Sequence, residues 1–309
     1  MAAKLRLGLI GVDDGQELEV ALGAEHVEVS GFWGENQVLM SELAAHYGQL
    51  AVASWHHLAT ADALYVGPRL SSPAQVLTQL ATWQRPLLLS PALLACEQAE
   101  ACIAPLLASG GVVNVARAAA VDGGLAYCRS LAQGGLLGSV LSATVRVASA
   151  DRDAAWAALA DELGTALWVS GLEPRSARWS SADADGALAV TALIECGDGA
   201  SLTAQVLAGV PGGAHDDLLA PRILGSRAQL ILAREPLGWF VAASESNVGR
   251  RWEKLVYAGL PGSLGRSMDA FARAVLADEA PPSPLTGEVA LVRLIAAMRR
   301  AGRGDWPAD

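Results

Sequence analysis

The sequence contains few of the residues that mark specialised classes of protein. Its four cysteines, Cys96, Cys102, Cys128 and Cys196, lack the spacing of metal ligands and do not suggest a disulfide framework. No stretch reaches the roughly 18 apolar residues of a membrane span, and the apolar run at residues 7–12 is too short for a signal peptide. We therefore expect a cytoplasmic protein without a disulfide, a metal site or a membrane segment.

Basic residues are scarce as well. The chain carries 22 lysines and arginines against 32 aspartates and glutamates, which gives a formal net charge of −10. An acidic chain without a basic cluster repels a phosphate backbone, so nucleic acid is excluded as a partner. The sequence also lacks a Walker loop, a zinc motif and a Ser–His–Asp signature, which excludes the chemistry that each of these motifs supports.

What the chain does have is apolar material and a regular alternation of elements. With 309 residues, 52% of them hydrophobic, it is long enough for two domains. Within residues 1–118, strands are predicted at residues 5–10, 27–32, 63–66, 86–89 and 112–115, and helices at residues 16–22, 38–47, 73–83 and 96–109. This alternation predicts an α/β domain, a Rossmann-type parallel sheet with helices on both faces.

Residues 119–309 follow a different pattern. Predicted strands follow one another at residues 187–195, 201–207, 228–232 and 237–242, after helices at residues 123–132 and 154–169 and a strand at residues 140–148. Two helices, at residues 267–277 and 287–300, finish the chain, and residues 180–186 have the composition of an exposed loop. Strands in succession predict an α+β domain with a large, mostly antiparallel open sheet.

Several segments, taken in order, carry a resemblance to a known family. They are the first strand at residues 4–11, the run Ala63-Leu64-Tyr65-Val66-Gly67-Pro68, the segment at residues 124–140, the turn at residues 222–230 and the closing helices at residues 271–300. In this order they resemble the family of glucose–fructose oxidoreductase, inositol dehydrogenase and the rhizopine-catabolism proteins (Gfo/Idh/MocA). The resemblance covers nearly the whole chain and implies the fold of a nicotinamide-dependent oxidoreductase of sugars or polyols.

The loop after the first strand departs from the dinucleotide-binding fingerprint Gly-x-Gly-x-x-Gly. The run is Gly11-Val12-Asp13-Asp14-Gly15, so Gly11 fits the first glycine, but Asp13 stands where the backbone should approach a pyrophosphate. If the Asp13 carboxylate and a phosphate charge of the pyrophosphate lie about 4 Å apart, they repel each other by roughly 4 kcal/mol at an effective dielectric of about 20. Gly15 restores room if the loop is rebuilt with both aspartates turned outward, so binding of NAD or NADP stays open.

The other cofactor positions that the resemblance implies are also altered. The acid for the ribose hydroxyls falls at Gly34, with Glu35 next to it as a replacement or as an exposed charge on a turn. Gly67-Pro68 stands where the family has a Thr-Pro-type loop, and Pro91 is the one residue kept from the family's Glu-Lys-Pro tripeptide. Neither a clear ribose acid nor a matching arginine is present, so the sequence does not choose between NAD and NADP.

The residues that perform proton chemistry in this family are missing. Ser90 replaces the lysine of the tripeptide, and a hydroxyl supplies no cation. On the second-domain helix, the family's acid and histidine fall at Glu162 and Ala166, so Glu162 or the neighbouring Asp161 acts as a base or belongs to a solvated helical face. His215, beside two aspartates, forms an acid–base pair, a weak metal site or an ordinary polar loop.

Three hypotheses follow. The favoured one is a catalytically silent, ligand-binding or regulatory member of the family, because the second glycine, the lysine and the histidine are all absent from one chain. The alternative is a working NAD(P)-dependent oxidoreductase in which Ser90, Asp161, Glu162 or His215 carries the proton chemistry. The third is a structural subunit that pairs with an active paralogue.

The second-domain sheet also predicts self-association. Apolar residues alternate along two predicted strands, which favours a sheet face that must be covered: Leu188, Val190, Ala192 and Ile194, then Leu202, Ala204 and Val206. The resemblance implies the same, since this family commonly forms dimers or tetramers through that sheet. We expect a homo-oligomer.

Overall fold

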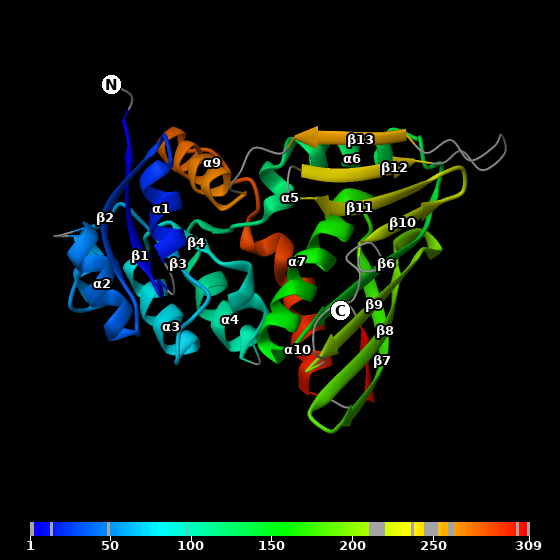
Figure 1. Cartoon of the computed structure of the whole chain (residues 1–309), viewed down its shortest axis with the longest axis horizontal. Helices are drawn as coiled ribbons and strands as arrows, with labels where there is room; N and C mark the ends of the chain where they lie inside the picture. The colour runs from blue at the N-terminus through cyan, green and yellow to red at the C-terminus, as the bar shows by residue number, and fades with distance from the viewer. Residues whose placement is uncertain are drawn as a thin grey trace. The chain divides into compact units, whose positions relative to one another are not determined.

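The computed structural model of the chain describes residues 3–12, 15–47, 50–96, 98–209, 220–235, 238–243, 253–258, 263–300 and 303–307. The chain divides into two compact units. The first combines Met1–Leu94, Gln98–Val121 and Gly262–Val289, and the second combines Ala95–Glu97, Asp122–Pro261 and Ala290–Asp309. Each unit is built on one sheet (Figure 1).

In the first unit, five strands form a parallel sheet in the order β2-β1-β3-β4-β5. The strands are β1 (Leu5–Ile10), β2 (Val27–Trp33), β3 (Ala63–Val66), β4 (Leu87–Leu89) and β5 (Val113–Val115). The helices are α1 (Gly15–Gly23), α2 (Gln37–Tyr47), α3 (Pro73–Trp83), α4 (Ala99–Ser109), α5 (Ala118–Val121) and α9 (Ser263–Ala277), with short 3-10 helices η2 (Trp55–Thr60), η3 (Pro91–Ala95) and η5 (Leu285–Glu288). The predicted Rossmann-type sheet is confirmed.

The strands are mostly apolar because both faces of this sheet are covered. Leu7 of β1 packs into a core with Leu18 of α1 and Phe271 of α9, and all three side chains are fully buried. On the other face, a Cβ atom at Gly8 would meet Leu64 Cδ2 at 2.9 Å, so that face is close-packed as well. Helices α3 and α4 lie against each other, and α1 lies against α9.

Residues from near the C-terminus complete the first unit. The backbone N–H of Val115, on edge strand β5, donates to the Ser283 carbonyl at 2.8 Å, and the Ser283 N–H donates to Asn114 Oδ1 at 2.7 Å. Together with the buried face of α9, these bonds place Gly262–Val289 in this unit. The division of the chain at residue 118 stays a prediction, and the observed units differ from it by this returning segment.

The second unit holds nine described strands in the order β13-β12-β11-β10-β6-β9-β8-β7-β14. They are β6 (Val140–Ser149), β7 (Pro174–Ala184), β8 (Ala187–Cys196), β9 (Ser201–Ala208), β10 (Arg222–Gly225), β11 (Gln229–Glu235), β12 (Gly238–Ala243), β13 (Glu253–Ala258) and β14 (Arg303–Pro307). The 3-10 helix η4 (Gly197–Gly199) joins β8 to β9, and the helices are α6 (Gly123–Gln133), α7 (Arg152–Ser170) and α10 (Val289–Arg300). The pair β6–β9 is parallel and the other pairs are antiparallel, which confirms the predicted α+β domain.

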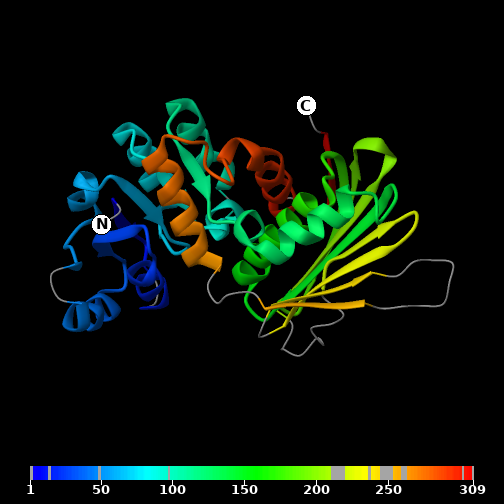
Figure 2. The ribbon, with the colours of Figure 1, turned by 90° about the horizontal axis from the view of Figure 1, so that it is seen from above.

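Helices of the same unit cover one face of this sheet. Figure 2 shows α6 and α7 lying along that face, and α7 packs on β6 and β9. Val190, Ile194 and Val206, from the apolar alternation, are buried there, whereas Thr191 on the opposite face is exposed. The alternation is therefore satisfied within the chain and does not itself indicate self-association, so the homo-oligomer stays a prediction.

The expected loop at residues 180–186 is wrong. Strand β7 continues to Ala184 and pairs with β8 along its length, so the turn consists of Asp185 and Gly186, both with positive φ (53° and 82°). Strands β10, β13 and β14 were also missed, because each is only four to six residues long and offers little periodicity.

Candidate cofactor and active site

The predicted cofactor residues of the first unit gather at one place. Parallel strands end at a common edge of the sheet, here called the carboxyl edge, where ligands of open α/β sheets bind. Gly11 follows β1 with φ +74°, and its N–H and that of Val12 both donate to the Trp33 carbonyl, at 2.9 and 3.1 Å. The Gly67 N–H donates to the Ile10 carbonyl at 2.7 Å. Those donors are used within the protein, so the Gly11 and Val12 amides are not directed at a phosphate.

Two glycines at this edge are required by the backbone beside them. A Cβ atom at Gly34 would lie 2.3 Å from the Val12 carbonyl oxygen, and one at Gly67 would lie 2.4 Å from the Gly11 oxygen. Neither position tolerates a side chain without moving the loop. This explains why Gly34 cannot carry the ribose acid and why a threonine is absent at position 67.

Glu35 is the acid next to that position, and its carboxylate is engaged. The Ser71 N–H donates to both of its oxygens, at 3.0 and 2.9 Å, and the Ser71 hydroxyl donates to Oε1 at 2.9 Å. Ser71 lies in the loop between β3 and α3, which begins at the predicted Gly67-Pro68. Glu35 is exposed, as expected for a charge on a turn, but its carboxylate is hydrogen-bonded, and its role toward a ribose stays a prediction.

A second carboxylate that the sequence analysis missed lies at the start of α1. This helix begins at Gly15, and Glu17 in its first turn accepts a 2.9 Å hydrogen bond from the buried Tyr65 hydroxyl of β3. Its Oε1 is 3.3 Å from the place of a Gly67 Cβ. A helix N-terminus attracts anions, and here the chain supplies one of its own. An acid in the first turn after β1 is the signal that would have revealed it.

Three predicted site residues lie outside the described residues. These are Asp13 and Asp14 of the glycine loop, and His215. Their roles stay predictions. For the residues that are described, the carboxyl edge as it stands does not fit a dinucleotide: the Glu35 carboxylate and the Gly11 and Val12 amides are occupied, and Glu17 adds negative charge.

At the end of β4, Ser90 occupies the position of the family's lysine. Its side chain is 7% exposed, its N–H donates to the Val66 carbonyl at 2.9 Å, and Pro91 then opens η3. A buried hydroxyl beside a 3-10 helix can donate one hydrogen bond, but it neither carries a positive charge nor has a pKa near neutrality. Ser90 therefore cannot replace the lysine.

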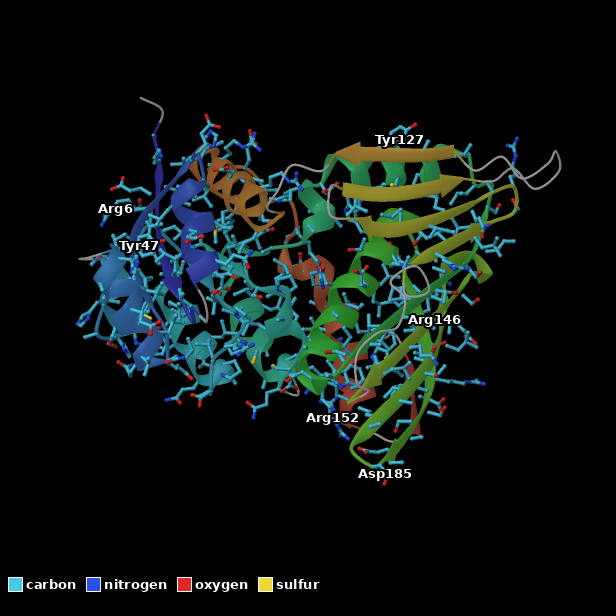
Figure 3. All side chains as sticks on the ribbon, viewed as in Figure 1. Arg6, Tyr47, Tyr127, Arg146, Arg152 and Asp185 are labelled. Atoms are coloured by element: carbon cyan, nitrogen blue, oxygen red, sulfur yellow. The ribbon has the colours of Figure 1, made fainter. Side chains whose placement is uncertain are left out.

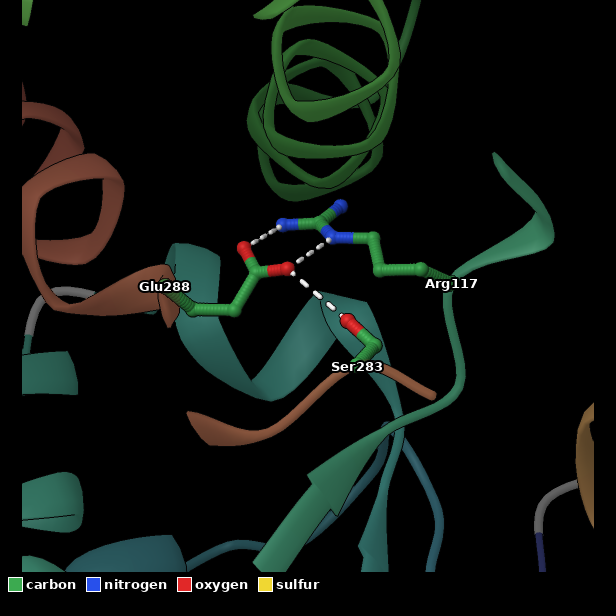
Figure 4. A network of polar contacts seen from close by, with 3 residues as sticks. All are labelled: Arg117, Ser283 and Glu288. Atoms are coloured by element: carbon green, nitrogen blue, oxygen red, sulfur yellow. Dashed lines mark hydrogen bonds and ion pairs between the residues drawn. The ribbon is translucent and has the colours of Figure 1, made fainter. Parts of the chain in front are cut away.

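A buried cation lies just past the end of the neighbouring strand β5. The Ala116 N–H donates to the Leu89 carbonyl at 2.9 Å, and the next residue is Arg117, whose side chain is 3% exposed. Its guanidinium binds Glu288 through two bonds, Nη2 to Oε2 at 2.9 Å and Nε to Oε1 at 3.2 Å, as Figure 4 shows. The pair was not predictable, because its members lie 171 positions apart.

The second unit holds the remaining predicted acids. Asp161 and Glu162 are half-buried on α7, and both contact other groups of the protein. Ala166, at the family's histidine position, is completely buried and lies on the same helical face as Leu159 and Leu163. That position therefore belongs to the core of the second unit, and a proton acceptor there would be enclosed.

Two buried cysteines, Cys128 and Cys196, are unsuited to nucleophilic chemistry. Burial, with the Asp122 carboxylate as a second cause, raises the pKa of the Cys128 thiol to about 12, and burial raises that of Cys196 to about 11. Both stay protonated near neutral pH. Across the part of the chain that the structure describes, there is no group of histidine, cysteine or acid side chains placed to hold a metal, and no helix is long and apolar enough to span a membrane.

The chain is similar to solved structures of known proteins. No family model and no curated protein matches the sequence. The aldose-aldose oxidoreductase from Caulobacter crescentus, complexed with glycerol, aligns over 99% of this chain and 100% of its own with a TM-score of 0.79 and 15% identity. The inositol dehydrogenase homolog from Azotobacter vinelandii, complexed with NADH and myo-inositol, aligns over 100% and 98% with a TM-score of 0.74 and 16% identity. UDP-N-acetylglucosamine 3-dehydrogenase from Acidithiobacillus ferrooxidans aligns over 97% of both chains with a TM-score of 0.73 and 18% identity.

Likeness at this level of identity shows the fold, and the chemistry of each protein rests on its own site. The order of elements that resembled the Gfo/Idh/MocA family in the sequence is thus matched in three dimensions along the whole chain. The protein has the fold of the Gfo/Idh/MocA-type oxidoreductases.

Proposed function

We propose that the chain uses this fold to bind a sugar-like or polyol-like ligand, in a ligand-binding or regulatory role, without nicotinamide-dependent hydride transfer. The observation that carries the proposal is how few lysines and histidines the chain has and where they lie. The chain has two lysines, Lys4 and Lys254. Lys4 precedes β1, at the opposite edge of the sheet, and Lys254 lies in β13 of the second unit. The carboxyl edge of the first unit has no lysine of its own.

Histidine is similarly restricted. Four of the five histidines, His26, His46, His56 and His57, belong to the first unit, and the second unit contains His215 alone. With alanine at the family's histidine position, a histidine base in the second unit has a single source. Arg117 does not replace the lysine either, because Glu288 neutralises it through two hydrogen bonds.

The test is a search for hydride transfer beside a search for binding. The purified protein is incubated with NAD⁺ or NADP⁺ and a panel of aldoses and polyols, and the absorbance of reduced nicotinamide is followed. We expect no reduction above the protein-free rate, while at least one sugar raises the melting temperature by binding the folded state. Turnover of about 1 s⁻¹ or faster, typical of working enzymes, would contradict the proposal.

A second candidate is a working NAD(P)-dependent oxidoreductase with a shifted site. Full-length likeness to NAD-bound structures supports it, including an oxidoreductase from Agrobacterium radiobacter in complex with NAD⁺ and L-tartaric acid, at a TM-score of 0.75 and 11% identity. His215→Ala separates the candidates. Turnover in the wild type that is lost in this variant would make His215 the base and the second candidate correct.

Self-association is a further part of the proposal. We expect a homo-oligomer through the open face of the second-unit sheet. Sedimentation velocity at micromolar concentration measures this directly, and a monodisperse monomer would contradict it.

A further inference from the structure

We infer that the loop between β3 and α3 occupies the protein's own ribose site, so that Ser71 binds the Glu35 carboxylate in the place of a nucleotide's sugar. An internal contact then excludes the nucleotide. The acid that would bind it is still present. The inference concerns binding and goes beyond the proposed function, because it names the segment of the chain that keeps a nucleotide out.

The contact between Ser71 and Glu35 has the chemistry of a ribose contact. In dinucleotide-binding domains, an acid at the end of the second strand accepts hydrogen bonds from ribose hydroxyls. Glu35 lies just past the end of β2, in the position next to Gly34. The Glu35 carboxylate accepts hydrogen bonds from the Ser71 hydroxyl and from the Ser71 N–H. These two neighbouring donors resemble the two hydroxyls of a ribose.

The same loop also packs on the glycine that follows β1. A Cβ atom built on Gly11 would lie 3.0 Å from Leu70 Cδ2 and 3.3 Å from the Arg69 carbonyl oxygen. The residue before Ser71 therefore packs on the first glycine of the loop that should face a pyrophosphate. The carboxylate and the glycine are the two features that the sequence shares with a dinucleotide site, and adjacent residues of one segment cover both.

The segment that covers these two features is exposed to solvent and can open. Arg69, Ser71 and Ser72 are exposed, and so is Glu35. Ser72 precedes α3 but its side chain makes no capping bond, whereas Ser71 is bonded to Glu35 and Arg69 makes a contact of its own. Exposed contacts of this kind are broken at small cost, because water replaces them.

The test combines hydrogen exchange with a direct binding measurement. Exchange of the backbone amides at residues 67–72 is measured by mass spectrometry, and NADH binding by calorimetry up to millimolar ligand. The variants are Ser71→Ala, which removes the hydroxyl, Glu35→Gln, which removes the acceptor charge, and Ser72→Ala as the matched neighbour. A cooperative melting transition establishes that each variant is folded.

The three variants have distinct expected results. Ser71→Ala raises exchange in this segment and tightens NADH binding by at least about tenfold, the change that corresponds to roughly 1.4 kcal/mol. Glu35→Gln raises exchange without any gain in affinity, because the ribose acid is lost. Ser72→Ala behaves as the wild type in both measurements.

Each other result overturns the inference. Unchanged exchange in both Ser71→Ala and Glu35→Gln would show that the Ser71–Glu35 contact does not hold the loop. Faster exchange without tighter NADH binding would show that the covered place is not a ribose site. Micromolar NADH binding by the wild type would show that the loop excludes nothing. Failure of this inference leaves the proposed function standing, because the missing lysine and histidine argue against hydride transfer without reference to this loop.

Discussion

Two glutamates near the carboxyl edge of the same sheet are held in different ways. Glu288 is 13% exposed and pairs with Arg117, which is 3% exposed, whereas Glu35 is exposed and accepts hydrogen bonds from a neutral serine. Removing one member of a buried ion pair leaves an uncompensated charge in the interior, but a released surface carboxylate is hydrated at once. Glu288 therefore fixes the returning C-terminal segment to β5, and Glu35 holds a loop that can open.

A third contact, between Arg152 and Asp183, is an exposed ion pair that can be compared with the buried one. Arg152, at the start of α7, binds Asp183 through two bonds of 2.9 Å, and Figure 3 shows Arg152 close to the tip of the β7–β8 hairpin. The Asp183 hydrogen bonds and charge raise the pKa of this guanidinium, so the arginine stays charged. Like the Arg117 pair it is bidentate, but its side chains are 44% and 53% exposed. Burial rather than geometry should then set the cost of losing each pair.

The largest effect is expected at the buried pair. Glu288→Gln leaves the Arg117 charge buried without its counter-ion and removes the anchor of the returning segment. We expect the free energy of unfolding of the first unit to fall by about 3–5 kcal/mol, measured by urea denaturation.

The control for that change replaces both members. Arg117→Met with Glu288→Leu removes the charges together, and most of the stability should return, because apolar pairs of similar volume substitute well for buried ion pairs. A single variant that is as stable as the wild type would show that the pair does not anchor the segment.

The next effect tests the backbone contact beside Glu35. Gly34→Ala places a Cβ atom 2.3 Å from the Val12 carbonyl oxygen and forces the loop to move. We expect a loss of about 1–3 kcal/mol in the free energy of unfolding. Gly23→Ala is the matched control, since nothing lies within 4 Å of its added atom. Equal stability of the two variants would mean that the loop can shift without strain.

A smaller effect is expected at the exposed glutamate. Glu35→Gln weakens hydrogen bonds that water can replace, so the free energy of unfolding should change by about 1 kcal/mol or less, measured by the same denaturation. A loss as large as that of Glu288→Gln would erase the distinction between an anchor and a loop that opens.

The smallest effect is expected at the surface pair. Arg152→Ala removes both bonds to Asp183, yet the urea midpoint should stay within error of the wild type, because the exposed pair is screened by solvent. A clear fall in the midpoint would show that bidentate geometry matters more than burial.

The sequence predicted most elements, and the reason lies in burial. Strand β3 is an unbroken apolar run buried on both faces, and β1 is interrupted by the exposed Arg6 alone. Helix α3 is delimited by Pro73 and the residues after Trp83. Strand β7 was missed as a whole, because its exposed residues, such as Ser180 and Asp183, have the composition of a loop. A strand with one exposed face shows a weaker apolar pattern than a strand buried on both faces.

The site was predictable in its positions and unpredictable in its contacts. The strand ends placed Gly11, Gly34 and Gly67 together, because parallel strands share an edge. The Ser71–Glu35 contact spans 36 positions and Arg117–Glu288 spans 171, and nothing in either residue's own neighbourhood specifies the partner. Only the fold brings them together.

The most direct test of this account is calorimetric titration of the wild-type protein with NADH and NADPH. The account predicts no saturable binding below millimolar cofactor, because Glu35 is bound by Ser71 and the Gly11 and Val12 amides are bound by the Trp33 carbonyl. A dissociation constant in the micromolar range for either cofactor would contradict it.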